Sequence, residues 1–458
     1  MSTVIKNGTV VTASDIYSAD ILIEGEKIVA VGQNLKGDKI IDAAGKYVFP
    51  GGVDGHTHLE LPVSGTVSAA WDTETVAAAV GGTTTIVDFA IQGSGGSLAD
   101  AVKIWREHKA EGKAAVDYGL HVAIGDLTES VLNEIPSIVS SGVPSLKLFM
   151  AYKGTLMADD STLLRTLKKA GECGALVCVH CENGDVIDVL SGQLVSQGKT
   201  EPKYHAESRP PEVEAEATGR AIALAEMAGA PIFIVHLSTA LALEKVKAAR
   251  EKGQPVYAET CPHYLLLSVE NYDRPDFQGA KYVCSPPLRQ QWNQEELWLG
   301  LSNGDLQVVG SDHCAFNWKG QKELGRDDFR KIPNGGPGIE NRLTLLYTYG
   351  VNTGRITLNK FVDLMATAPA KLLGLYPQKG TIAVGGDADL LIFDPEAEGE
   401  ISAKTQKQDI DYNAFEGLKY KGASETVLLR GQLIVDKGRF VGKIGGGRFI
   451  PRKPFQRF

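Results

Sequence analysis

The chain has 458 residues, of which 43% are hydrophobic and 22% charged, and this length exceeds what a single small core requires. Its formal net charge of −9 argues against general binding to nucleic acid or to an anionic membrane, because both need a basic face. We find no apolar run of transmembrane length and no signal-peptide pattern. The six cysteines are sparse and lack the spacing of a disulfide framework, so we expect a cytoplasmic protein.

The first 50 residues are predicted to form short strands, because β-branched runs alternate there with turn residues. From about residue 50 to 375, apolar runs alternate with segments of helical period. Eight strands are predicted in that region: Tyr47–His58, Thr83–Ala90, Val116–Ile124, Ser145–Met150, Ala175–His180, Pro231–His236, Pro255–Cys261 and Leu306–Asp312. Eight strand–helix units predict a (β/α)8 TIM barrel. The alternative is a doubly wound open sheet, but no Gly-X-Gly-X-X-Gly follows the first strand.

Strand-like segments return near the C-terminal end, for example at Ala388–Phe393. The simplest arrangement pairs residues 1–50 with residues 376–445 in a smaller β-sandwich domain. The catalytic barrel, residues 51–375, is then inserted between these two halves. The last segment, residues 446–458, contains several Arg and Lys residues. It is either a frayed tail or an arm that contacts a neighbouring subunit.

Metal-binding residue types stand at the predicted strand ends, where barrel enzymes carry their catalytic groups. A His-X-His on a strand places both imidazoles on one face, and such a pair can bind one metal ion. The strand ends carry four imidazoles, one carboxylate and one lysine: His56, His58, His180, His236, Asp312 and Lys147. Chance explains this set poorly, since the chain has nine histidines in all. We therefore predict a metal site.

Four imidazoles and a carboxylate exceed what one catalytic zinc ion needs, so we expect two ions. Two close cations need an anionic bridge, and a lysine ammonium has only donors. Desolvation would remove the extra proton from Lys147, and the neutral amine could add carbon dioxide to give a carbamate, which is a carboxylate-like ligand. The alternative is an ion pair between Lys147 and Asp312.

The remaining five histidines have simpler explanations. His108 lies in a charged helix and is expected to be solvated. His121 lies inside a strand, where it packs, and His205 is expected in a loop. His263 and His313 are near strand ends, so we expect them to orient ligands or substrate rather than to bind metal.

Three of the cysteines, Cys173, Cys178 and Cys181, are close enough in sequence to suggest a zinc set. However, strand alternation places Cys178 and Cys181 on opposite faces, and Cys173 is at a helix end. We interpret them as small packing residues.

With these residues in hand, the chain resembles the dihydropyrimidinase/D-hydantoinase family of cyclic amidohydrolases over nearly its whole length. The motifs that carry the resemblance are Gly55-His56-Thr57-His58, Gly81-Gly82-Thr83-Thr84-Thr85, Ser145–Tyr152, His180-Cys181-Glu182-Asn183, Val235-His236-Leu237-Ser238, Cys284–Arg289, Gly310–Cys314 and Ile332–Gly335. Together these motifs are specific, whereas His-X-His alone is not.

The resemblance implies a homotetrameric barrel enzyme with two divalent metal ions, usually zinc, with manganese and cobalt as alternatives that accept the same ligands. One ion would be bound by His56, His58 and Asp312, the other by His180 and His236, and carbamylated Lys147 (N6-carboxylysine) would bridge them. The segment beyond Gly445 resembles the inter-subunit arm of the family.

The resemblance also implies substrate contacts. Tyr152 matches the tyrosine that contacts the substrate carbonyl, and Ser285 and Asn334 match positions whose main chain hydrogen-bonds the ring amides. Leu61 and Leu156 lie in the segments that follow the first and fourth strands. Either they line an apolar pocket for the substituent at the exocyclic carbon of the ring, or they make ordinary packing contacts within loops.

The expected reaction opens the cyclic amide of a hydantoin or a 5,6-dihydropyrimidine to give an N-carbamoyl amino acid. In this hypothesis a hydroxide that bridges the two ions attacks the amide carbon, and one ion and Tyr152 stabilise the oxyanion. Asp312 takes the proton of the attacking water and returns it to the leaving ring nitrogen.

Other activities are alternatives. Dihydroorotases typically place Arg two residues after His-X-His, where this chain has Glu60, so an acidic substrate is disfavoured. Allantoinase activity is a closer alternative than dihydroorotase activity and is harder to distinguish from hydantoinase activity by sequence. Some relatives of a different class are non-enzymatic scaffolding proteins that have lost metal ligands, and the complete ligand set argues against that class here.

Overall fold

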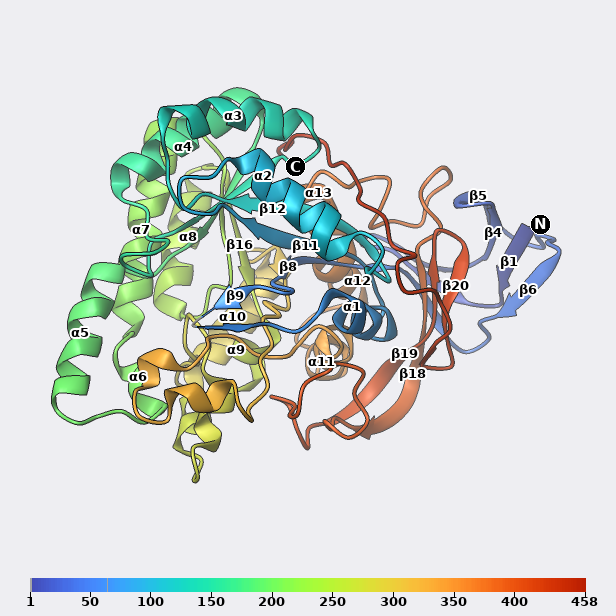
Figure 1. The fold of residues 1–458 in the computed structure, drawn as a ribbon. Helices are drawn as coiled ribbons and strands as arrows, with labels where there is room; N and C mark the ends of the chain where they lie inside the picture. Colours follow the sequence, from blue (N-terminus) through green and yellow to red (C-terminus); the bar gives the residue numbers. More distant parts are fainter. Residues whose placement is uncertain (1, 64) are drawn as a thin grey trace.

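The computed structural model describes residues 2–63 and 65–458 and contains a barrel beside a two-layer β-sandwich (Figure 1). Eight parallel strands form the barrel sheet in the order β17-β16-β15-β14-β13-β12-β11-β8. Their bounds are β8 Gly52–Thr57, β11 Thr83–Ile91, β12 Asp117–Ala123, β13 Ser145–Phe149, β14 Leu176–His180, β15 Ile232–Ile234, β16 Val256–Thr260 and β17 Val308–Val309. The first and last strands meet just beyond β17, where the Ser311 N–H donates to the Asp54 carboxylate at 3.1 Å.

Helices surround the barrel strands, and local sequence explains several of their ends. Asp159 and Thr239 cap α4 and α8 by accepting main-chain N–H groups, whereas Gly174 and Gly229 end α4 and α7 with positive φ. The helix bounds are α1 Trp71–Val80, α2 Leu98–Lys103, α3 Glu129–Ser140, α4 Asp160–Cys173, α5 Gly184–Ser196, α6 Lys203–Glu207, α7 Pro211–Ala228, α8 Ala240–Glu251, α9 Pro262–Leu266, α10 Trp292–Asn303, α11 Arg342–Leu346, α12 Leu358–Val362 and α13 Ala368–Leu372. None of the helices in the described part of the chain has both the length and the apolar character that crossing a membrane requires.

The predicted strand Tyr47–His58 is wrong as a single element, because it is two strands in different sheets. β7 (Tyr47–Pro50) pairs with β2 and β18, whereas β8 pairs with β11. The change of sheet occurs at Gly51, where a β-carbon would lie 2.2 Å from the Thr84 hydroxyl. Only glycine lets the chain pass this close to β11, and the unbroken apolar run concealed the crossing.

The sandwich contains strands from both ends of the chain. A four-stranded sheet has the order β5-β4-β1-β6, and a seven-stranded sheet has the order β21-β20-β19-β18-β7-β2-β3. Their remaining bounds are β1 Ser2–Lys6, β2 Thr9–Val11, β3 Ile16–Ser18, β4 Asp20–Glu24, β5 Lys27–Gly32, β6 Lys39–Asp42, β18 Leu390–Glu400, β19 Lys419–Leu429, β20 Gln432–Asp436 and β21 Arg439–Phe440. Ile5 and Ile21 of one sheet share a buried cluster with Val48 and Leu390 of the other.

The predicted fold class, a TIM barrel with a smaller β-sandwich built from both chain ends, is therefore confirmed. The residue bounds that we assigned to the domains stay a prediction.

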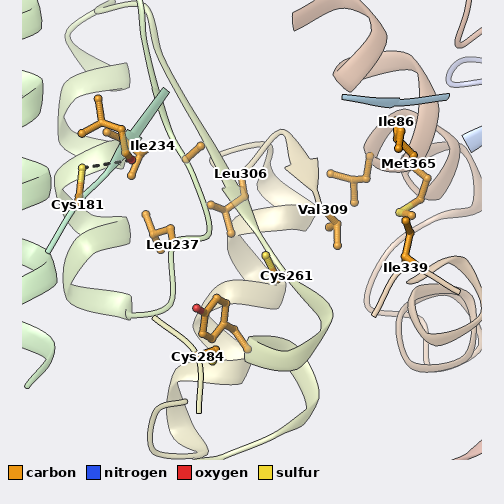
Figure 2. Close-up of a cluster of buried hydrophobic side chains, with 14 of the residues drawn as sticks. Ile86, Cys181, Ile234, Leu237, Cys261, Cys284, Leu306, Val309, Ile339 and Met365 are labelled. Atoms are coloured by element: carbon orange, nitrogen blue, oxygen red, sulfur yellow. Dashed lines mark hydrogen bonds between the residues drawn. The ribbon is translucent and has the colours of Figure 1, made fainter. Parts of the chain in front are cut away.

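Cysteines take part in the main hydrophobic core, part of which Figure 2 shows. Cys181, Cys261 and Cys284 are buried there among aliphatic side chains such as Ile234 and Leu237. Cys178 is fully buried in a second apolar cluster inside the barrel. These positions agree with the interpretation of Cys178 and Cys181 as packing residues.

The C-terminal tail, residues 446–458, lies against the barrel of its own chain, and Figure 1 shows the C-terminus beside the barrel. The Ile450 N–H donates to the Tyr118 carbonyl at the amino end of β12. Arg452 is buried, and its guanidinium donates to two main-chain carbonyls and to the Ser145 hydroxyl. Contact of the tail with a neighbouring subunit stays a prediction.

We expect Arg452→Met to lower the free energy of unfolding by about 2–4 kcal/mol, because buried acceptors lose their donor while the stem still packs. Arg457→Met is the matched control, because that side chain is exposed and, among the described residues, donates a single hydrogen bond, to the Gly253 carbonyl. Urea unfolding of the two variants measures the difference. Equal stability would contradict a structural role for the buried guanidinium.

Candidate active site

The carboxyl ends of the barrel strands bring the six predicted metal ligands together. His56 and Lys147 lie within β8 and β13, His180 ends β14, and His58, His236 and Asp312 follow β8, β15 and β17. Parallel strands in a closed barrel point the same way, so residues that are distant in sequence meet at one face.

Among the described residues, one group of three has the geometry of a metal site: the ligand atoms of His56, His58 and Asp312 all lie within 4.8 Å of one another. Asp312 Oδ1 is 3.3 Å from His56 Nε2 and 3.5 Å from His58 Nε2. His56 Nε2 is buried and has no hydrogen-bond partner in the structure. A divalent cation at this point would satisfy that atom, so the donor set fits a metal ion.

His180 and His236 form a second pair, with His180 Nδ1 3.0 Å from His236 Nε2. His180 Nε2 lies 2.9 Å from the Glu182 carboxylate, which favours the proton on Nε2 and leaves Nδ1 as an acceptor. The His236 ring is 5.2 Å from the His56 ring, centroid to centroid, so the two groups adjoin. The pair therefore offers ring nitrogens for a second cation next to the first.

Lys147 is fully buried, and its Nζ has no hydrogen-bond partner in the structure. The nearest groups include the rings of Phe89 and Phe149, whose centroids are 5.1 and 5.0 Å away. Within the described residues, Asp312 pairs with His56 and His58, and the alternative ion pair with Lys147 is not formed. Burial lowers the pKa of Lys147 to about 8. A buried ammonium without acceptors is costly, so a neutral amine or its carbamate fits this environment better.

The electrostatics of the histidines also suit metal binding. Burial holds the pKa of His56 and of His236 well below the usual value. Both rings are therefore neutral at physiological pH, and the neutral imidazole is the form that binds metal.

Three residues at or just after the same strand ends have a strained backbone. Tyr152, His236 and Asp312 have φ angles of 66°, 41° and 47°, in the left-handed region that non-glycine residues rarely adopt. Each such residue costs on the order of 1–3 kcal/mol and persists only where the surrounding structure imposes it. Clustered strain of this kind is typical of functional sites.

Glu259 on β16 was missed by sequence reasoning, although it contacts a predicted ligand. Its Oε1 lies 2.6 Å from His56 Nδ1, and this contact orients the ring so that Nε2 faces Asp312. Burial and the charges of Asp54 and Asp312 raise the pKa of Glu259 well above its usual range. The available signal was a carboxylate inside the otherwise apolar strand Pro255–Cys261.

The expected orienting role of His313 agrees with its contacts. Its carbonyl accepts the His58 N–H at 2.8 Å, and its ring Nε2 lies 2.9 Å from the Glu74 carboxylate. His263 is half-buried and lines a small pocket together with Asp312, and desolvation there lowers its pKa to about 4. His108 is exposed, as expected.

A cavity of about 470 Å³ adjoins the predicted ligands. Tyr152, Ser285 and Asn334 line it, and the Asn334 side chain donates to the Ser285 hydroxyl at 3.0 Å. Leu61 and Leu156 line the same cavity. All the residues predicted to contact substrate therefore lie around one space of the size that a small molecule needs.

Two further cavity residues, His205 and Arg209, were not assigned from the sequence. The prediction that His205 lies in a loop is wrong, because it is buried in α6 and donates from Nε2 to the Cys284 carbonyl at 2.8 Å. Arg209 follows α6, and its guanidinium contacts the His205 ring at 3.2 Å. Neither residue is near a strand end, so the barrel pattern gave no signal for them.

Comparisons with known proteins identify the family. Residues 47–434 match the amidohydrolase family. The chain belongs to this family. It is 54% identical to a D-hydantoinase from Geobacillus stearothermophilus. The alignment spans 459 positions and covers 99% of this chain and 97% of the relative. The resemblance inferred from the motifs is thus confirmed, and the chain is an amidohydrolase.

Solved structures agree with this assignment. A dihydropyrimidinase from Brevibacillus agri NCHU1002 is 55% identical, with a TM-score of 0.99 and full coverage of both chains. An L-hydantoinase from Arthrobacter aurescens is 32% identical, with a TM-score of 0.90 over 98% of this chain and 99% of that one. The fold around the site is therefore shared well beyond the close relatives.

We expect Glu259→Ala to weaken the binding of divalent metal about 10–100-fold, because the His56 ring loses the group that orients it. Metal retained against increasing chelator concentration measures the effect. Glu340→Ala is the control, because that carboxylate accepts the main-chain N–H groups of Lys407 and Gln408 and contacts no predicted ligand. Equal loss of metal from both variants would argue against a specific role for Glu259.

Proposed function

We propose that this amidohydrolase opens the cyclic amide bond of hydantoins and 5,6-dihydropyrimidines and releases N-carbamoyl amino acids. The observation that carries the proposal is that one cavity is lined both by five of the six predicted metal ligands and by Ser285 and Asn334. Full-length relatives named D-hydantoinase and dihydropyrimidinase, at 54% and 55% identity, support it.

We propose that the site holds two divalent cations, which are zinc or, with the same ligands, manganese or cobalt. His56, His58 and Asp312 would hold one cation and His180 and His236 the other, and the carbamate of Lys147 would be shared. The buried ring nitrogens without partners and the uncompensated lysine support this assignment. When bound, such ions supply Lewis acidity and lower the pKa of water toward neutrality.

Residues around the cavity would carry out the proton transfer, stabilise the developing negative charge and orient the ring. The Asp312 carboxylate holds the proton that the attacking water loses and delivers it to the leaving ring nitrogen. The Tyr152 hydroxyl donates a hydrogen bond to the carbonyl oxygen as negative charge develops there. Burial raises the pKa of Tyr152, so this hydroxyl keeps its proton at neutral pH. The main chain of Ser285 and Asn334 orients the ring amides.

The residues in and near the cavity indicate which substituent and which substrate charge the site favours. Leu61 and Leu156 offer an apolar surface for the ring substituent. Glu60, at the position where dihydroorotases typically carry Arg, pairs with Lys113 at 2.8 Å. This position therefore supplies no positive charge for an acidic substrate, as it would in a dihydroorotase. We also propose a homotetramer located in the cytoplasm, where the six free thiols would remain reduced.

A substrate panel tests the function: dihydrouracil, allantoin, dihydroorotate and 5-substituted hydantoins of both hands. We expect the metal-loaded enzyme to hydrolyse dihydrouracil and hydantoins and to leave dihydroorotate intact. Asp312→Ala should keep the fold, judged by circular dichroism, and lower turnover by about 10²–10⁴-fold. Substantial residual turnover by Asp312→Ala would contradict the role of Asp312 as the proton carrier. A wild-type protein that binds no metal and hydrolyses neither substrate class would favour a scaffolding role.

Loading of the second cation should depend on carbon dioxide, because an unmodified lysine cannot bridge two cations. Apoprotein reloaded with zinc in carbon dioxide-free buffer is expected to bind about one equivalent per chain, and about two after bicarbonate is added. Metal analysis after gel filtration measures the stoichiometry. In Lys147→Met the stoichiometry should not respond to bicarbonate, and a response there would contradict the carbamate.

A further inference from the structure

A second buried lysine lies beside the cavity. Lys322 begins the short helix η4 (Lys322–Gly325) and is fully buried. Its ammonium group donates to the carbonyls of Val283, Pro333 and Gly335 at 2.9, 2.7 and 2.5 Å. The ion pairs formed by the described residues do not include Lys322. An ammonium has three N–H donors, so the three carbonyls satisfy it completely.

The three carbonyls belong to two loops, residues 283–285 and 333–335, which carry Ser285 and Asn334 to the cavity. The loops also contact each other, through a main-chain hydrogen bond of 3.0 Å and through the Asn334 side chain on the Ser285 hydroxyl. Lys322 therefore joins the two loops next to the residues that face the cavity.

The carbonyl of Pro333 is in the same peptide group as the N–H of Asn334. A trans peptide is planar and holds its C=O and N–H in opposite directions. Lys322 attracts this oxygen, so the Asn334 N–H is directed away from Lys322. Within the described residues that N–H donates to no protein acceptor, so it is free to bind a ligand.

In the described part of the chain, no carboxylate forms an ion pair with the Lys322 ammonium. Another fully buried lysine, Lys379, differs in this respect. Lys379 lies within 3.0 Å of the carboxylates of Asp117, Asp387 and Asp389. Burial lowers the pKa of Lys322 to about 7, so retaining an ammonium there is costly. An apolar residue would fill the space at lower cost but could not orient three carbonyls from two loops.

We propose that Lys322 is a positioning residue for substrate: it orients the peptide group of the Asn334 N–H and holds the loop that carries Ser285 against the Asn334 loop, so that the main-chain groups of both residues can recognise the ring amides. This inference rests on the proposed cyclic amide hydrolysis. The ring amides are common to all such substrates, and these contacts are made in both the bound state and the transition state. Loss of Lys322 should therefore raise KM by the same factor for different substrates and change kcat little.

Lys322→Met tests the proposal, because methionine has a similar length and no donor, and Lys379→Met is the matched control. With the metal-loaded enzyme, we expect Lys322→Met to raise KM about tenfold for dihydrouracil and for a 5-substituted hydantoin alike. The kcat and the metal content should stay close to wild type. Lys379→Met should lower the melting temperature and leave KM unchanged, because its partners do not contact the cavity.

Several results would overturn the inference. The first is a KM of Lys322→Met within twofold of wild type. The second is a rise in its KM for only one of the two substrates, and the third is a loss of bound metal from this variant. If Lys322→Met does not fold, Lys322→Gln replaces it, and because the amide keeps two N–H donors, KM should rise by more than twofold but by less than the rise of about tenfold expected for Lys322→Met. Failure of both variants to fold would make Lys322 purely structural and overturn the positioning role. A wild-type enzyme inactive on both substrates would instead overturn the proposed function, and this inference with it.

Discussion

The site depends on contact between the first and last strands of the barrel. Ser311, just after β17, donates to Asp54 on β8, and the carbonyl of His313 accepts the N–H of His58. These two hydrogen bonds bring Asp312 against the His-X-His, although the two lie at opposite ends of the barrel sequence. A metal site made from β8 alone would have two ligands, so closure of the barrel is what creates the three-ligand group.

Three buried lysines show how the environment decides what one residue type does. Lys379 is surrounded by carboxylates and joins the barrel to the sandwich as a conventional ion cluster. Lys322 is surrounded by carbonyls and orders two loops. Lys147 has no acceptor in the structure and lies among aromatic rings and metal-binding groups. The lysine that the protein leaves unsatisfied is thus the one whose chemistry the proposed metal site requires.

The sequence predicts the parts of this structure that follow strand periodicity and strand ends. All eight barrel strands and the six predicted ligands are recognisable because buried parallel strands are apolar runs, against which a terminal His, Lys or Asp stands out. The crossing at Gly51 was not recognisable, since β7 and β8 form one apolar run in the sequence. Lys322 and Arg452 were missed for another reason. Their partners are mostly main-chain carbonyls of residues far along the chain, and a single sequence carries no pattern for such contacts.

The proposed function divides the cavity lining into two kinds of contact. Main-chain groups, which side-chain substitution alters little, would recognise the ring, and Lys322 would hold the peptide group of Asn334 in place. Side chains such as Leu61 and Leu156, on segments outside the barrel strands, would contact the substituent. Solved structures named D-hydantoinase and L-hydantoinase share this fold, with TM-scores of 0.98 and 0.90. Substitution of the apolar side chains would therefore change the contacts with the substituent and leave the main-chain groups in place.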